Sequence, residues 1–227
     1  MKPMLTQLEV CVERVEHAIQ ATEAGATRLE YNSALKLDGL TPSLAACRHL
    51  CNAVSVPVIG MLRPHSHSFC YDRYEQSILI EDCQQLIAQG LSGVAFGCLT
   101  SDGEIDWALL RKVRSTCDGE LVFHRALDCL PHPSVWIEKL IDHGVNRVLS
   151  SGGARTALEG AEELARMVCA AKDRIEILAG GGVRSSNAKA LLELTGCEQL
   201  HGSFKSDQSC EIVPDLEEIY AVSRLIQ

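Results

Sequence analysis

The chain has 227 residues, of which 46% are hydrophobic and 22% charged, a composition typical of a folded globular protein. Its net charge of −9 argues against nucleic acid or an anionic membrane as the main partner, because both bind clusters of lysine and arginine. The opening stretch MKPMLTQLEVC lacks the apolar core of a signal sequence, and no run approaches the roughly 18 apolar residues of a membrane span. We therefore expect a cytoplasmic protein that does not enter a membrane.

Short β-rich segments alternate with amphipathic helical segments along the whole chain. Eight strands are predicted, and in chain order they are LEVC from Leu8, RLEY from Arg28, PVIGMLR from Pro57, GVAFG from Gly93, ELVFHR from Glu120, RVLSS from Arg147, IEILAG from Ile175 and QLHGSF from Gln199. The predicted helices between and after them include residues 43–54, 106–117, 134–144, 158–172 and 215–227. Glycines typical of helix ends stand at Gly25, Gly90, Gly144 and Gly196.

Eight βα units in 227 residues correspond to about 28 residues each, near the ~30 that one βαβ unit needs. This count predicts an α/β fold in which residues 1–227 form a single domain, a (β/α)8 TIM-like barrel of parallel strands. An open, doubly wound sheet is the alternative, and the number of strands favours the barrel.

The eleven cysteines suit a reducing compartment, where they remain thiols. Their odd number does not allow a complete set of disulfides, and no pair has the CxxC spacing. Cys47 and Cys51 are the nearest pair and stand one helical turn apart, where buried cysteines often fill small gaps. Zinc at this pair would need two further ligands, which the sequence does not identify.

Polar residues gather in the predicted strands and at their C-terminal ends, where barrels carry their active sites. They are Glu9, Glu30, Arg63, His124, Arg125, Asp128 and His201. Alone, a strand carboxylate can serve only to pair with a neighbouring arginine. Together these residues predict a catalytic site, because barrel interiors are usually apolar and unpaired buried charge is costly. We expect His124 or a carboxylate to act as general acid or base, and Arg63 and Arg125 to hold an anion.

Two glycine-rich turns, SSGGA and AGGGVRSSNA, follow the sixth and seventh predicted strands. Their glycines are Gly152, Gly153, Gly180, Gly181 and Gly182. Backbone amides can approach a ligand at such turns, and a helix beginning near Ser185 or Ser186 would present its positive end. We predict a phosphate, sulfate or carboxylate group here, with a tight turn that needs only positive φ as the alternative. The turn is not a P-loop, because no GKS or GKT follows.

The loop RPHSHSFC follows the third predicted strand and therefore lies at the barrel mouth. His65 and His67 are two residues apart, which places both on one side of an extended segment, with Cys70 nearby. Imidazole nitrogens suit copper, zinc or nickel. The alternative, which we favour, is a polar lid whose histidines only tune the charge above the pocket.

Nine ordered motifs resemble those of the CutC family, which is linked by name to copper homeostasis. They are LEVC, RLEYNSAL, DGLTPS, LRP, GVAFGCLTSDG, VFHRALD, RVLSSGG, ILAGGGVR and LHGS, and they extend from Leu8 to Ser203. The resemblance implies a TIM-like barrel, a cytoplasmic location and binding or handling of copper, as Cu(I). It also implies that Cys11, after the first strand, corresponds to a family cysteine. Cys11 and the two loop histidines, His65 and His67, are the candidate metal ligands.

Two departures from the family pattern bear on copper. Where the family reads close to RIELC in the second strand, this chain has Asn32 in place of the cysteine. Where the family reads close to RPRGGDF, this chain has RPHSHSF. Soft Cu(I) prefers thiolate and thioether ligands, so the first departure argues against a two-cysteine site.

Two functional classes therefore remain. One is a copper-binding homeostasis protein, and the other is a barrel enzyme, a hydrolase, lyase or isomerase, that acts on a small anionic or phosphorylated substrate. The expected partner is a copper ion or a small anionic ligand, with neither nucleic acid nor membrane. Whether the chain forms a homo-oligomer is left open.

Overall fold

The structure is a computed structural model that describes residues 6–206 and 212–226. Residues 1–5, part of the opening stretch in which no signal sequence is expected, lie outside the described residues, as do residues 207–211. Gln227, the last residue of the expected final helix, also lies outside them.

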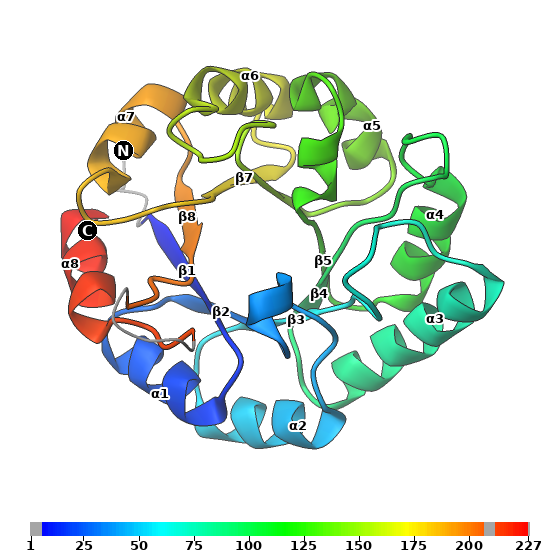
Figure 1. Ribbon diagram of the computed structural model, residues 1–227, viewed down its shortest axis with the longest axis horizontal. Coiled ribbons are helices and arrows are strands. Elements are labelled where there is room, and N and C mark those ends of the chain that lie inside the picture. The colour runs from blue at the N-terminus through cyan, green and yellow to red at the C-terminus, as the bar shows by residue number, and fades with distance from the viewer. Residues whose placement is uncertain (1–5, 207–211, 227) are drawn as a thin grey trace.

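The eight predicted strands are all present and close into one parallel barrel, in the order β1 to β8 (Figure 1). They are β1 (Gln7–Val12), β2 (Arg28–Tyr31), β3 (Val58–Met61), β4 (Gly93–Phe96), β5 (Glu120–Phe123), β6 (Arg147–Ser150), β7 (Glu176–Gly180) and β8 (Gln199–Gly202). The last strand pairs with the first, with Glu9 opposite His201, so the sheet has no open edge. This closure confirms the (β/α)8 barrel and excludes the open sheet.

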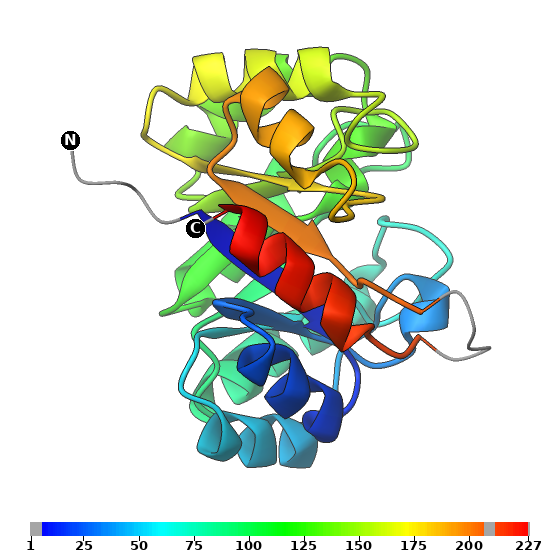
Figure 2. The same ribbon diagram turned by 90° about the vertical axis from the view of Figure 1, so that its left-hand side faces the viewer.

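Helices form the outer ring. They are α1 (Val15–Glu23), α2 (Leu44–Ala53), α3 (Arg73–Ala88), α4 (Trp107–Thr116), α5 (Ile137–Asp142), α6 (Ala161–Ala171), α7 (Ala188–Thr195) and α8 (Leu216–Ile226). The last helix, α8, lies between α1 and α7 and covers the outside of β1 and β8 (Figures 1 and 2). Within the described ranges, no helix is long and apolar enough to span a bilayer.

Helix ends agree with the glycine pattern, while some starts differ from expectation. Gly25, Gly90, Gly144 and Gly196 each follow a helix and have φ between +69° and +109°, which L side chains rarely adopt. The segment expected to be helical from residue 134 is first a 3-10 turn, Pro133–Trp136, because Pro133 opens it. The helix expected near Ser185 or Ser186 begins only at Ala188, after Asn187 has closed a turn onto Arg184.

Side chains alternate between two cores. Those facing outward pack under the helices in one large apolar cluster, whereas a smaller cluster fills part of the barrel interior. The interior cluster comes from β3 to β7 and consists of Ile59, Met61, Ala95, Val122, Leu149 and Leu178. The opposite interior wall, formed by β8, β1 and β2, carries buried Glu9, Arg28, Glu30 and His201 instead. Within the barrel interior, the wall formed by β8, β1 and β2 is therefore the more polar one, and the wall from β3 to β7 is largely apolar.

Candidate functional site

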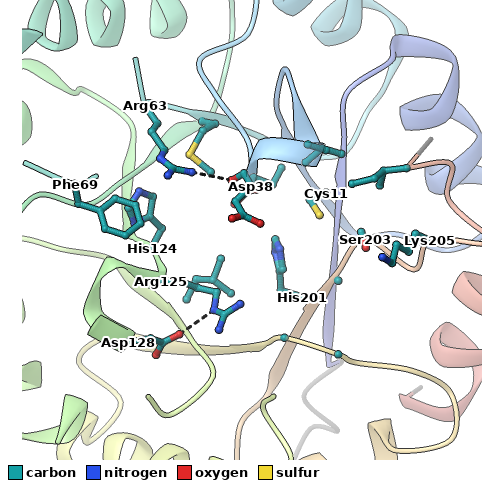
Figure 3. Close-up of a pocket in the computed structure, with 18 of the residues that line it drawn as sticks. Cys11, Asp38, Arg63, Phe69, His124, Arg125, Asp128, His201, Ser203 and Lys205 are labelled. Atoms are coloured by element: carbon teal, nitrogen blue, oxygen red, sulfur yellow. Dashed lines mark hydrogen bonds and ion pairs between the residues drawn. The ribbon is translucent and has the colours of Figure 1, made fainter. Parts of the chain in front are cut away.

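A cavity of about 720 Å³ opens at the C-terminal ends of the strands, as expected for a barrel site (Figure 3). Six of the seven predicted catalytic residues line it together with the predicted ligand Cys11, and the set is Cys11, Glu30, Arg63, His124, Arg125, Asp128 and His201. Glu9 does not line the cavity; it lies two residues before Cys11 in β1, where it contacts the His201 side chain. These polar residues thus lie together at the C-terminal end of the barrel, where the sequence placed them.

Three possible metal ligands meet at the base of this cavity. Cys11, Glu30 and His201 come from β1, β2 and β8, and one donor atom of each lies within 4.8 Å of the others. The register explains the meeting, since Cys11 pairs with Glu30 across β1 and β2. Of the three predicted metal ligands only Cys11 takes part, and its neighbours are two residues that we had assigned to catalysis.

Glu9 supports this cluster from below. Its Oε1 lies 2.7 Å from Nδ1 of His201, and its Oε2 forms a buried ion pair with Arg28. Burial opposes ionisation of Glu9, but Arg28 and His201 hold the pKa of its carboxyl well below the usual range. The carboxylate therefore fixes the imidazole with Nδ1 as donor and leaves Nε2 to face the cavity.

Burial also shifts the pKa values of the three possible metal ligands. Burial raises the pKa of the Cys11 thiol and of the Glu30 carboxyl. Burial would lower the pKa of His201, but Cys11 and Glu30 raise it well above its usual value. The raised pKa favours protonation of His201, and a metal that binds Nε2 must displace a proton there.

Asn32 contacts the same cluster. Its Nδ2 donates to Oε1 of Glu30 over 3.0 Å. Oε2 of Glu30 and Oδ1 of Asn32 are buried and have no hydrogen-bond partner within the described ranges. A buried carboxylate oxygen without a donor is costly, so a bound cation or a donor from a ligand would satisfy it.

Beneath Glu9, a buried ionic network that the sequence analysis did not identify extends toward the N-terminal end of the barrel. Arg28 and Arg147 both donate to Oε1 of Gln199, and Arg147 also pairs with Glu120 and Glu176. The signal was available in the alternation of β6 to β8, which places Arg147, Glu176 and Gln199 in neighbouring strands. The network stabilises the charges that the barrel interior would otherwise exclude.

His124 stands on the far wall of the cavity. Burial, together with Arg63, lowers its pKa to about 3, so the ring is neutral at physiological pH. Its Nδ1 accepts the backbone N–H of Ala126 over 3.2 Å, which assigns the proton to Nε2. That Nε2 is buried and finds no partner in the part of the chain that the structure describes. His124 is therefore a neutral hydrogen-bond donor.

Arg63 binds the protein's own backbone. Its Nη1 donates to the carbonyls of Leu37, Asp38 and Gly39, and its Nη2 donates to the carbonyl of Ser66. The ring of Phe69 lies 4.8 Å from the guanidinium carbon. These contacts leave only Nε unpaired among the described residues, so Arg63 mainly anchors the loops after β2 and β3.

Asp128 organises the first glycine turn. It accepts hydrogen bonds from the hydroxyls of Ser150 and Ser151 and from the backbone N–H of Gly153. The backbone N–H of Gly152 donates to Oγ of Ser150. Because both glycine amides are engaged inside the turn, Gly152 and Gly153 do not present donors to the cavity.

The second glycine turn does reach the cavity, through Gly181 and Gly182. Gly180, also a predicted binding residue, lies opposite His201, and an added Cβ would meet Leu149 at 2.6 Å. Its small size therefore makes room for the core and for the histidine ring.

His65 and His67 do not join the thiol. Nε2 of His65 lies 3.1 Å from Oε1 of Glu75, and its Nδ1 accepts the backbone N–H of His67. The two rings stack on each other, and His67 is exposed. With both ring nitrogens of His65 engaged, the geometry favours the lid over a metal site.

Among the lining residues that the sequence analysis did not assign to the site, three are charged or carry a hydroxyl, namely Asp38, Ser203 and Lys205. Ser203 and Lys205 directly follow β8, so their position at a strand end was the available signal. Asp38 reaches the cavity through an irregular loop with φ +63°, which no periodicity predicts.

Comparison with known proteins agrees with this architecture. The model of the CutC family matches residues 6–206. A protein of Treponema denticola named as CutC is 42% identical over 199 residues, covering 86% of this chain and 80% of the relative. A protein of the same name from Aliivibrio fischeri is 39% identical over 206 residues, covering 89% of this chain and 83% of the relative.

Solved structures extend the comparison. A crystal structure from Streptococcus agalactiae, described as a candidate copper homeostasis protein CutC, superposes with a TM-score of 0.83 at 28% identity. It covers 87% of this chain and 98% of its own. A phosphoribosylanthranilate isomerase of Thermotoga maritima shares the barrel alone, with a TM-score of 0.60 at 12% identity, covering 97% of this chain and 98% of the isomerase. The family match over most of the chain, the relatives near 40% identity and the shared barrel together place this chain in the CutC family.

Proposed function

We propose that the protein binds and handles copper in the cytoplasm, through Cys11 and His201 with Glu30 as a third donor. The observation that carries this proposal is the convergence of one thiol, one imidazole and one carboxylate within 4.8 Å at the base of the cavity. The family match and the description of the Streptococcus agalactiae structure point to copper homeostasis. The ten described cysteines are all free thiols, which suits a reducing compartment.

The donors fit copper, and each suits a particular oxidation state of the ion. A thiolate and an imidazole can bind Cu(I) in a two-coordinate site, whereas a carboxylate suits a divalent ion. Glu9 supplies the supporting contact typical of metal-bound histidine, since it holds Nδ1 of His201 and directs Nε2 to the ligand position. The unpaired Oε2 of Glu30 is the oxygen available for a third bond.

The test is an anaerobic competition titration of purified protein against a Cu(I) chelator. The variants are Cys11→Ser and His201→Gln, with Cys169→Ser as the matched control because Cys169 is exposed on α6. We expect each site variant to lose at least about tenfold in affinity and the control to lose none. Equal affinities for all four proteins would rule out this site.

A second candidate function rests on His124. A neutral imidazole with a free Nε2–H in a cavity can polarise a carbonyl or donate a proton, which suits a hydrolase, lyase or isomerase acting on a small anionic or phosphorylated substrate. Its test is turnover of a panel of small phosphorylated and carboxylated compounds, followed by NMR. Activity that disappears in His124→Gln but persists in Cys11→Ser would favour the enzyme over copper handling.

A further inference from the structure

Arg125 is held rigidly at the cavity edge. Its Nε donates to Oδ2 of Asp128 over 2.9 Å (Figure 3), and its Nη2 donates to Oγ of Ser151 over 2.8 Å. Asp128 is in turn fixed by the backbone N–H groups of Ser151 and Gly153. Nη1 has no partner within residues 6–206 and 212–226, so the guanidinium is oriented in advance with one nitrogen free for a ligand.

The backbone of the second glycine turn lies directly against that guanidinium. A Cβ added to Gly181 would stand 3.7 Å from Cζ of Arg125 and 3.3 Å from Cβ of Ser151. The carbonyls of Gly181 and Gly182 are fixed by the backbone N–H of Ala157 and by Nδ2 of Asn187. Their own amides donate to no described residue, although both glycines line the cavity.

A second cation faces Arg125 across the cavity. Ser203 and Lys205 follow β8 and line the same space (Figure 3). Their segment is anchored on both sides, because Phe204 is fully buried between them and the carbonyl of Lys205 accepts a bond from Arg184. Neither the hydroxyl of Ser203 nor Nζ of Lys205 contacts a partner in the described part of the chain.

We propose that these groups form a binding site for the phosphate group of a small phosphorylated molecule. The donors are Nη1 of Arg125, Nζ of Lys205, Oγ of Ser203 and the amides of Gly181 and Gly182. An oxyanion accepts charge-assisted hydrogen bonds from such a set, and barrels often bind phosphate at the loops after strands seven and eight. Within the described residues Lys205 has no carboxylate partner, and Arg125 keeps Nη1 free although its Nε pairs with Asp128.

The size of the cavity indicates more than a free ion. A volume of about 720 Å³ lies in the range of small-molecule sites and far exceeds one phosphate group. The same cavity is also lined by His124 and by the cluster of Cys11, Glu30 and His201. This inference deepens the second candidate function, on which its substrate class rests, and it does not require a bound metal.

The test is a titration of the metal-free protein with inorganic phosphate at constant ionic strength, followed by ¹H–¹⁵N NMR. We expect the amide signals of Gly181, Gly182 and Ser203 to shift, and sulfate to compete. Lys205→Gln should weaken binding about tenfold and Arg125→Gln at least as much, since each removes a charge-assisted hydrogen bond. Lys189→Gln, an exposed change on α7, is the matched control.

The outcomes separate this inference from the proposed functions. Arg125→Gln also removes the partner of Asp128, and thermal unfolding must therefore first show that this variant folds. Lys205→Gln leaves the contact between Arg125 and Asp128 intact. Unchanged phosphate affinity in Lys205→Gln, or shifts spread equally over remote lysines, would overturn the inference. Phosphate binding that survives in Cys11→Ser supports it even if the copper titration fails, and binding without turnover counts only against the enzyme.

Discussion

Oε1 of Glu9 lies 2.7 Å from Nδ1 of His201, across the strand pair that closes the barrel. The same carboxylate forms a buried ion pair with Arg28. Glu9 thus connects the candidate metal ligands above it with the ionic network below it. A carboxylate that orients an imidazole in this way usually affects metal affinity almost as strongly as a ligand does.

Replacing Glu9 by Gln should therefore weaken Cu(I) binding by about 10- to 100-fold. It should also destabilise the fold by roughly 3–5 kcal/mol, because Arg28 loses its counter-charge inside the barrel. Chelator competition and urea denaturation measure the two effects. Glu176→Gln is the control, since Glu176 pairs with Arg147 in the same network but does not contact His201. Equal loss of copper affinity in both variants would mean that only the network charge matters.

Replacing Asn32 by Cys should tighten Cu(I) binding by at least about tenfold, because it adds a soft thiolate where only an amide now stands. The side chain of Asn32 already reaches the cluster, since its Nδ2 donates to Glu30. Chelator competition compares wild type, Asn32→Cys and the control Asn32→Ser, which removes the amide without adding a thiolate. If Asn32→Cys changes nothing while Cys11→Ser abolishes binding, our interpretation of this departure from the family is wrong.

Replacing both His65 and His67 by Ala should leave Cu(I) affinity unchanged. One nitrogen of His65 contacts Glu75, the other accepts the backbone N–H of His67, and neither histidine lines the cavity. The expected effect is faster proteolysis of the loop, since it loses the stacking of the two rings and the contact with Glu75. A clear drop in copper affinity for the double variant would show that His65 and His67 are copper ligands after all.

His124 should make stability depend on pH. Its pKa falls from the ordinary 6.5 to about 3 in the folded protein, so between these values only the unfolded chain takes up the proton. Stability therefore falls as pH falls through this window, by up to about 1.4 kcal/mol per pH unit. Urea denaturation should show wild type losing about 2 kcal/mol relative to His124→Gln between pH 7 and 5.

An exposed histidine provides the control for that measurement. His49 lies on the outer side of α2, and His49→Gln should lose stability with falling pH as wild type does. A constant difference between wild type and His124→Gln across the range would show that His124 takes up its proton equally in both states.

Local pattern predicted the barrel well. Strands and helix ends such as Gly25 and Gly196 follow from hydrophobic periodicity and from φ values that only glycine adopts readily. Helix starts were less accurate, as at Ala188, because a turn closed by Asn187 takes up the residues expected to begin the helix. Such features depend on interactions between residues close together in the sequence, and a sequence pattern can therefore predict them.

What the sequence determined by itself was therefore the eight-stranded barrel, its family and the end of it that carries polar residues. Only the tertiary structure decided which of those residues meet. Cys11 joins Glu30 and His201 rather than His65, because strand register brings together residues as far as 192 positions apart. Arg63 binds carbonyls while Arg125 keeps a nitrogen free, a difference set by which loops fold onto each. Hydrogen bonds and ion pairs act over a few ångströms, and the sequence does not give the distances between residues that are far apart along the chain.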